Sequence, residues 1–306
     1  MDKVRHGSVT LSARSVGTRE TGRDVLLVHG LNANMAFWHP VLTRELAARH
    51  FLVMYDQRGH GHSDLPPSGY TPGELAHDAA AVLDAYGLQQ ADIVAHSFGS
   101  TVALQIARLF PERVRSLTLL DARLRLFQPV LKLAEWPDFE KWKASLGAAG
   151  ERLDPDLSLD FMLPLYLADG AVRQASGDLV ANGFAPMGGG RRGAARYRRL
   201  LAETTAITDF QSSDGLDLAS IQALACPVSA IYGSRSPFLE TLRALQQALP
   251  RCEAHLVEDG GHNFPVRFPE RTAQLVLDFL ERNASASDTA PATSAPMAST
   301  GNRESS

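Results

Sequence analysis

The chain has 306 residues, of which 44% are hydrophobic and 21% are charged, so it can bury a large core and belongs to neither the fibrous nor the membrane class. Lys and Arg total 30 against 34 Asp and Glu, which leaves a formal charge of −4 and no overall field that would gather nucleic acid or an anionic surface. The 2 cysteines cannot build a disulfide framework, and the N-terminus has no apolar signal segment. We therefore expect a soluble, cytoplasmic protein whose partner is a small molecule.

Short apolar runs alternate with helical stretches along most of the chain. Strands are predicted at residues 9–15, 24–29, 51–55, 91–95, 116–120, 227–232 and 254–257. Helices are predicted at residues 36–48, 71–86, 98–110, 240–249 and 269–282. This alternation predicts an α/β fold with a mostly parallel central sheet and helices on both faces.

One long interval breaks the rhythm of strands and helices. Between Asp121 and residue 224 the sequence is helical and irregular where the rest of the pattern uses a short connection, and it carries large apolar side chains such as Phe127, Trp136 and Phe161. We expect residues 1–121 and 225–283 to form the core and residues 122–224 to form an inserted helical lid that helps to select the substrate. Residues 284–306, rich in Ser, Ala, Thr and Pro, are predicted to be a disordered tail.

A basic cluster lies in the last part of the predicted lid. The segment GGGRRGAARYRRLL contains Arg191, Arg192, Arg196, Arg198 and Arg199. We interpret this run as a solvated helix face, which is the more frequent role of such a sequence. Binding of an anionic substrate or of a phosphate-bearing carrier protein is the alternative.

A serine stands between a predicted strand and a predicted helix in the segment ADIVAHSFGSTVALQIA. Ser97 has small residues two positions before and two positions after it, Ala95 and Gly99, which is a relaxed form of the nucleophile-elbow pattern. Small flanking residues allow the tight turn that pushes the hydroxyl out over the sheet. The alternative is that Ser97 only caps the helix that follows it.

Three other segments accompany this motif: LLVHGLNAN, YDQRGHGHSD and VEDGGHNF. With them, the chain resembles the α/β-hydrolase superfamily over residues 8–283. The resemblance implies Ser97 as the nucleophile, His262 as the general base, and the backbone N–H groups of Leu31 and Phe98 as the oxyanion hole. An imidazole can activate a serine hydroxyl, and an N–H group at a helix N-terminus can stabilise a developing oxyanion. His29 and His60 are expected to hold loops by hydrogen bonds.

The position that most often carries the acid in the superfamily is occupied here by a serine. It lies after the glycine of AIYGSRSPF and is Ser236, which cannot stabilise an imidazolium as a carboxylate does and which we expect to take no part. The superfamily has a second place for the acid, at the end of the strand after the nucleophile helix, and that strand here ends on Asp121. A charge at the end of an apolar strand needs a partner, so we predict Asp121 as the acid. The alternatives are Glu240, Asp214 and Asp217.

Together these assignments predict a serine esterase that cleaves a carboxylic ester or lactone of a small, largely apolar substrate through an acyl-enzyme. The mechanism calls for no metal and no organic cofactor. A thioesterase or a C–C bond hydrolase with the same triad is an alternative within this chemistry. A ligand-binding protein that has kept the fold without turnover is the alternative from another class.

Overall fold

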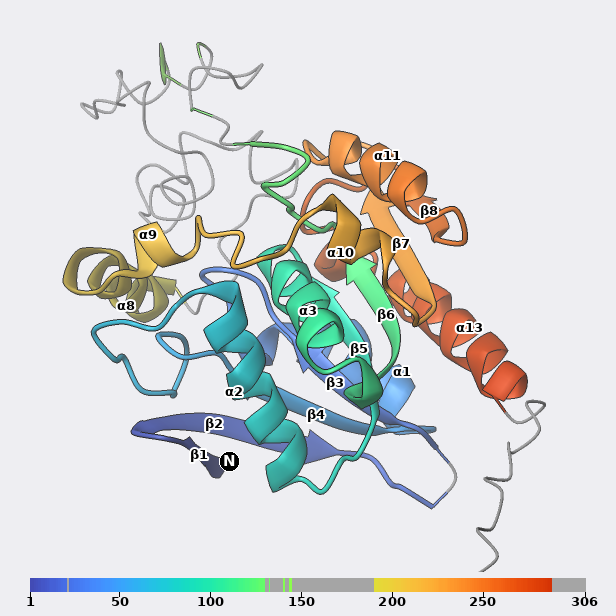
Figure 1. Ribbon diagram of the computed structural model, residues 1–306, viewed down its shortest axis with the longest axis horizontal. Coiled ribbons are helices and arrows are strands. Elements are labelled where there is room, and N and C mark those ends of the chain that lie inside the picture. The colour runs from blue at the N-terminus through green and yellow to red at the C-terminus, as the bar shows by residue number, and fades with distance from the viewer. Residues whose placement is uncertain (21, 130–131, 133–139, 141–142, 145–189, 288–306) are drawn as a thin grey trace, which may run out of the picture.

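The computed structural model describes residues 1–20, 22–129, 132, 140, 143–144 and 190–287. Its centre is an eight-stranded sheet with the order β1-β2-β4-β3-β5-β6-β7-β8 (Figure 1). The strands are β1 (Asp2–His6), β2 (Val9–Val16), β3 (Asp24–Val28), β4 (Phe51–Asp56), β5 (Ala91–His96), β6 (Val114–Leu120), β7 (Val228–Gly233) and β8 (Glu253–Val257). The pairs β1·β2 and β2·β4 are antiparallel, and the neighbours from β4 to β8 are parallel. The predicted α/β fold with a mostly parallel sheet is confirmed.

Apolar side chains alternate between the two faces of the sheet and build a hydrophobic cluster on each face. In β3, Leu26 and Val28 point to the cluster that contains α2 (Pro72–Ala85), α3 (Phe98–Leu109) and α11 (Leu239–Ala248). Val25 and Leu27 point to the opposite cluster, which contains α1 (Arg44–Ala47) and α13 (Pro269–Ser287). A strand buried on both faces must be apolar throughout, which is why β3 reads as the short continuous run that the sequence displays.

The first strand of the sheet was not predicted from the sequence. Residues Asp2–His6 form β1, which turns back into β2 through Gly7, whose φ of 59° lies in the left-handed region. In β1, Val4 alone is buried, because the strand lies at the edge of the sheet. An edge strand of five residues with one apolar position in the core carries almost no periodic signal.

The stretch predicted as one helix at residues 36–48 is divided into three short elements. A 3-10 turn (Met35–Phe37) is followed by a π-helical segment (His39–Thr43) and then by α1. Pro40 lies at the start of the π-helical segment, where its missing N–H group and its ring prevent a regular α-helix from running through.

Between β6 and β7, the described part of the chain contains α8 (Gly190–Glu203), α9 (Ala206–Asp209) and α10 (Leu218–Gln222). Trp136 and Phe161 of the predicted lid lie outside the described residues, as do residues 288–306 of the predicted tail. At the other end of the core, α12 (Phe264–Arg267) precedes α13, which extends to Ser287, past the predicted start of the tail. None of the helices described is both long enough and apolar enough to cross a membrane.

Candidate functional site

Ser97 occupies a strained turn between β5 and α3. Its φ of 56° and ψ of −124° lie outside the regions that residues other than glycine normally adopt. Its N–H group donates to the carbonyl of Leu120 over 2.9 Å, which ties the turn to the end of β6. The Ser97 side chain makes no capping hydrogen bond to α3, so the alternative role of helix cap does not hold.

Two glycines allow the backbone to pack closely around this turn. A Cβ atom on Gly99 would lie 2.5 Å from the carbonyl oxygen of Val28 and 2.6 Å from that of His29. A Cβ atom on Gly30 would lie 2.9 Å from Cβ of Ser97, so the loop after β3 comes directly against the serine. Within the described residues, the N–H groups of Leu31 and Phe98 have no acceptor in the protein. Of the two predicted oxyanion donors, Phe98 directly follows Ser97 in the chain, and Leu31 directly follows Gly30, which packs against Ser97.

His262 and Asp121 meet at the carboxyl ends of the parallel strands. Nδ1 of His262 lies 2.7 Å from Oδ2 of Asp121, whose side chain is completely buried. The His262 ring stacks on the ring of His96 with centroids 5.0 Å apart, and it meets the ring of Phe238 edge-on at 4.9 Å. Because His96 directly precedes Ser97, these contacts hold the imidazole beside the turn that carries the serine.

The Asp121 carboxylate has two further partners, and one of them is Ser236. The hydroxyl of Ser236 donates to Oδ2 of Asp121 over 2.6 Å, and the N–H group of Gly233 donates to Oδ1 over 3.1 Å. From the sequence, Ser236 is expected to take no part, but this buried serine donates a hydrogen bond to the predicted acid, Asp121. Ser236 thus contacts the carboxylate although it occupies the position where the superfamily most often has the acid itself. Burial raises the pKa of Asp121, while the hydrogen bonds from His262, Ser236 and Gly233 oppose that rise.

The three alternative acids have other surroundings. Glu240 lies in the first turn of α11 and is exposed. Asp214 accepts a hydrogen bond from the N–H group of Gly73 over 2.8 Å, and Asp217 caps α10. The geometry therefore joins His262 to Asp121, as the sequence predicts.

Three buried histidines surround the site, and burial is the main reason why their pKa values are low. The pKa of His29 is lowered to about 4, and those of His60 and His96 are lowered to about 3. Nε2 of His29 accepts from the N–H group of Gln57 over 3.1 Å, and Nδ1 of His60 lies 3.1 Å from the carbonyl oxygen of Arg58. His29 and His60 thus hold the loops after β3 and β4, as predicted.

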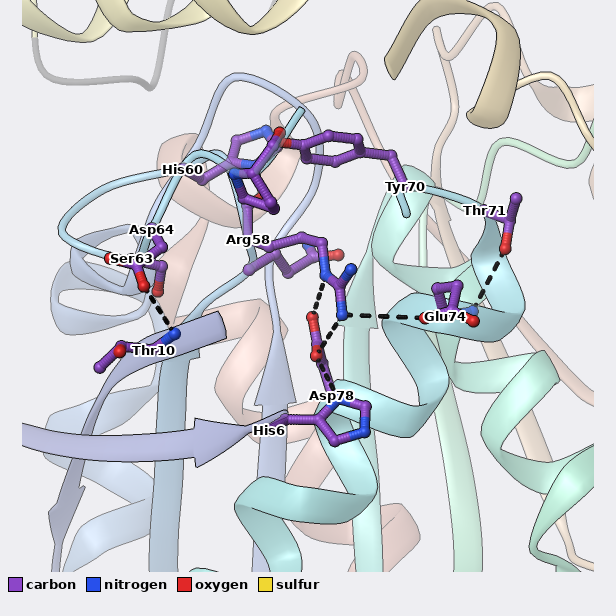
Figure 2. A network of polar contacts seen from close by, with 12 residues as sticks. His6, Thr10, Arg58, His60, Ser63, Asp64, Tyr70, Thr71, Glu74 and Asp78 are labelled. Atoms are coloured by element: carbon purple, nitrogen blue, oxygen red, sulfur yellow. Dashed lines mark hydrogen bonds and ion pairs between the residues drawn. The ribbon is translucent and has the colours of Figure 1, made fainter. Parts of the chain in front are cut away.

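A separate group of buried charges lies between the loop after β4 and α2 (Figure 2). The Arg58 guanidinium donates to the two carboxylate oxygens of Asp78 over 2.6 and 2.7 Å, and Nδ1 of His6 lies 2.8 Å from Asp78 Oδ1. Glu74 approaches Arg58 to 4.0 Å. This network fastens β1 and the loop to α2. Nowhere in the described residues do three His, Cys, Asp or Glu side chains gather as metal ligands would.

Two hydrolases are similar to this chain over nearly its whole length. The putative carbamate hydrolase RutD of Variovorax paradoxus is 32% identical over 263 residues, which cover 85% of this chain and 92% of that protein. The 2-(acetamidomethylene)succinate hydrolase of Mesorhizobium japonicum is 27% identical over 288 residues, which cover 91% of this chain and 94% of that protein.

Solved structures share the fold at lower identity. Est816, an N-acyl homoserine lactone degrading enzyme, has a TM-score of 0.66 at 21% identity, over 91% of this chain and all (100%) of that chain. The enol-lactonase from Burkholderia xenovorans LB400 has a TM-score of 0.63 at 18% identity, over 92% of this chain and 100% of that chain. Residues 25–267 match the family model of the alpha/beta hydrolase fold, and the chain therefore belongs to the α/β-hydrolase family, with hydrolysis as its class of reaction.

Proposed function

We propose that this protein is a serine hydrolase that cleaves an ester-type acyl bond through an acyl-enzyme, with Ser97, His262 and Asp121 as its triad. The observation that carries the proposal is the 2.7 Å contact between His262 Nδ1 and Asp121 Oδ2 beside the strained turn of Ser97. When Nδ1 carries the ring proton and donates a hydrogen bond to Asp121, the free lone pair of the imidazole lies on Nε2. Nε2 is then the atom that accepts the serine proton.

The proposed reaction has two halves. Ser97 Oγ attacks the carbonyl carbon while His262 accepts its proton, and the resulting oxyanion is stabilised by the N–H groups of Leu31 and Phe98. The intermediate collapses when His262 gives the proton to the leaving group. A water molecule, deprotonated by His262, then attacks the acyl-enzyme and releases Ser97 with its proton restored. Asp121 stays ionised throughout and stabilises the imidazolium.

A carboxylic ester or lactone is the first candidate substrate. An acyl bond to nitrogen is the second candidate, because the two relatives described above are named for a carbamate and for an acetamidomethylene compound. The same residues serve both, since the tetrahedral intermediate is alike and the leaving nitrogen receives its proton from His262. Thioester and C–C bond cleavage remain further variants of this chemistry.

Turnover of p-nitrophenyl esters with graded acyl chains, compared with p-nitrophenyl carbamates and anilides, tests the proposal and ranks the two candidates. Ser97→Ala should abolish turnover without unfolding the protein, because the hydroxyl forms the covalent bond. Ser8→Ala is the control, since Ser8 is exposed in the turn between β1 and β2. Turnover by purified Ser97→Ala protein above the level of host esterases would refute the proposal and would favour a ligand-binding protein on this fold.

A further inference from the structure

A cavity of about 610 Å³ lies between α8 and the loops that follow β3 and β4. Residues 32–36 line it on one side and residues 59–62 line it on another. Arg14 of β2 and Arg192 and Arg196 of α8 also contribute to its wall. One of its lining residues, Asn32, directly follows Leu31 in the chain, so their Cα atoms lie about 3.8 Å apart.

The wall of this cavity has an excess of positive charge in a chain whose formal charge is −4. Among the described residues that line it, the one acidic residue is Asp56. Both oxygens of that carboxylate accept hydrogen bonds: Oδ1 from the N–H group of Met35 and Oδ2 from that of His62, each over 2.7 Å. Across the described part of the chain, no carboxylate pairs with Arg14, Arg192 or Arg196. Among the described residues, these three arginines therefore carry positive charge that no carboxylate offsets.

Arg196 is held in place by neutral groups. Its Nε donates to the carbonyl of Gly59 over 3.1 Å, and its Nη2 donates to the carbonyl of Ser63. Carbonyl oxygens orient a guanidinium without neutralising its charge. Arg196 therefore fastens α8 to the loop after β4 and keeps a full positive charge at the wall of the cavity.

The basic cluster seen in the sequence divides into two groups. Arg199 pairs with Glu203 at 3.0 Å on the outside of α8, and Arg198 is exposed, so these two fit the predicted solvated face. Arg192, which is exposed, and Arg196, which is half-buried, also line the cavity, so the alternative of binding an anionic group stays open for these two. Arg192 and Arg196 lie four positions apart and so share one face of the helix, whereas Arg198 lies on another.

We propose that this cavity binds a negatively charged group of the substrate, a carboxylate or a phosphate, so that the enzyme prefers anionic esters to neutral ones. This inference rests on the proposed function, because it needs the acyl carbonyl to lie between the N–H groups of Leu31 and Phe98. From there a substrate chain enters the cavity at Asn32 and reaches the arginines. A guanidinium matches the two oxygens of a carboxylate or phosphate by paired hydrogen bonds.

The test compares p-nitrophenyl hexanoate with the p-nitrophenyl monoester of adipate, which has the same acyl length and a terminal carboxylate. We expect kcat/KM to favour the adipate ester by at least about tenfold, the effect of one charge-assisted hydrogen bond. Arg192→Gln and Arg14→Gln should each reduce this ratio by about tenfold, chiefly through KM. Arg198→Gln, on the same helix but outside the cavity, should keep the wild-type ratio. A wild-type enzyme without preference would overturn the inference and leave the proposed function intact.

Calorimetry on the Ser97→Ala protein separates binding from turnover. Adipate should bind this variant, and the additional change Arg192→Gln should weaken binding by about tenfold. Inorganic phosphate should compete with adipate, because both would use the same arginines. If the wild type hydrolyses neither ester, the proposed function fails. Adipate binding then tests by itself whether the cavity binds an anionic group. Absence of adipate binding, or phosphate binding without competition, would overturn the assignment of the cavity to the substrate.

Discussion

Two buried aspartates in this molecule each contact a histidine, but they differ in their other partners. Asp78 is 1% exposed and faces the Arg58 guanidinium, which keeps its proton at every accessible pH (Figure 2). Asp121 is 0% exposed and is held by a serine hydroxyl, a backbone N–H group and an imidazole. Asp78 forms a permanent ion pair with Arg58, whereas in the proposed mechanism the charge of Asp121 stabilises an imidazolium that forms during the reaction.

The partners of a buried carboxylate indicate whether its role is structural or functional. A buried charge is costly unless it is paired, and a permanent cation is the direct solution, as at Asp78. At Asp121, burial raises the pKa, and hydrogen bonds from His262, Ser236 and Gly233 oppose that rise by stabilising the ionised form. A carboxylate stabilised in this way, at the end of a parallel strand and next to a histidine, is suited to support a change of charge in its partner.

The largest effect is expected at Asp121. Asp121→Asn keeps the size of the side chain but removes the charge that stabilises the imidazolium and fixes its tautomer, so kcat should fall by on the order of 10⁴. Steady-state kinetics with a p-nitrophenyl ester measures this loss. Glu240→Gln, at the exposed alternative, should retain activity close to that of the wild type. The opposite pattern would transfer the acid to Glu240.

A change at Asp78 should affect stability rather than chemistry. Asp78→Asn leaves the buried Arg58 without its counter-charge, which should lower the free energy of unfolding by about 3–5 kcal/mol. Asp84→Asn is the matched control on the same helix, because the Asp84 side chain is 67% exposed in its pair with Arg113 and should cost at most about 1 kcal/mol. Urea titrations measure both variants. Equal stability losses would contradict the distinction between the buried and the exposed pair.

Acid should destabilise the fold through its buried histidines. His29, with a pKa of about 4, and His60 and His96, each with a pKa of about 3, are neutral in the folded protein and take up protons on unfolding below their ordinary pKa of 6.5. The unfolded state then binds more protons, so stability should fall as pH drops from 6.5 towards 4, by about 1.4 kcal/mol per pH unit for each histidine. Asp121, with its raised pKa, opposes this trend in part.

Urea titrations over this pH range test the prediction. His60→Gln should reduce the slope of stability against pH, because it removes one buried imidazole that cannot ionise in the folded state. His77→Gln, at an exposed position on α2, should leave the slope as it is. A wild-type stability that stays constant across this range would contradict the account of neutral buried histidines.

The smallest effect concerns the support of Asp121. Ser236→Ala removes the hydroxyl that donates to Oδ2, so kcat should fall by about tenfold while KM stays near its wild-type value. Ser236→Thr, which keeps the hydroxyl, should restore much of the loss. Ser234→Ala, two residues earlier, is the control. Full activity in Ser236→Ala would show that the hydroxyl of Ser236 does not support catalysis, as expected from the sequence.

The chain reveals its central strands because they are buried on both faces and therefore read as apolar runs, β3 and β5 most clearly. The turn at Ser97 is also visible in sequence, since the tight approach to β3 requires small residues such as Gly99. Asp121 is singled out in the sequence because it ends such a run, and the structure places it in contact with His262. In contrast, β1 has one buried position and hence no usable periodicity.

Two other features could not be predicted because they depend on contacts between distant segments of the chain. The hydrogen bond from Ser236 to Asp121 joins residues far apart in the chain and depends on the pairing register of β6 and β7. The orientation of Arg192 and Arg196 depends on which face of α8 meets the loop after β4. Neither register nor helix rotation leaves a signal in the local sequence.

Labelling with a fluorophosphonate tests the central claim most directly, because the reagent reacts only with an activated serine. Intact-mass and peptide analysis should find one label on the peptide that contains Ser97, with none on the Ser97→Ala protein. The labelling rate should be far lower in Asp121→Asn and unchanged in Glu240→Gln. Absence of label on the wild type, or equal rates for the wild type and Asp121→Asn, would contradict a triad built from Ser97, His262 and Asp121.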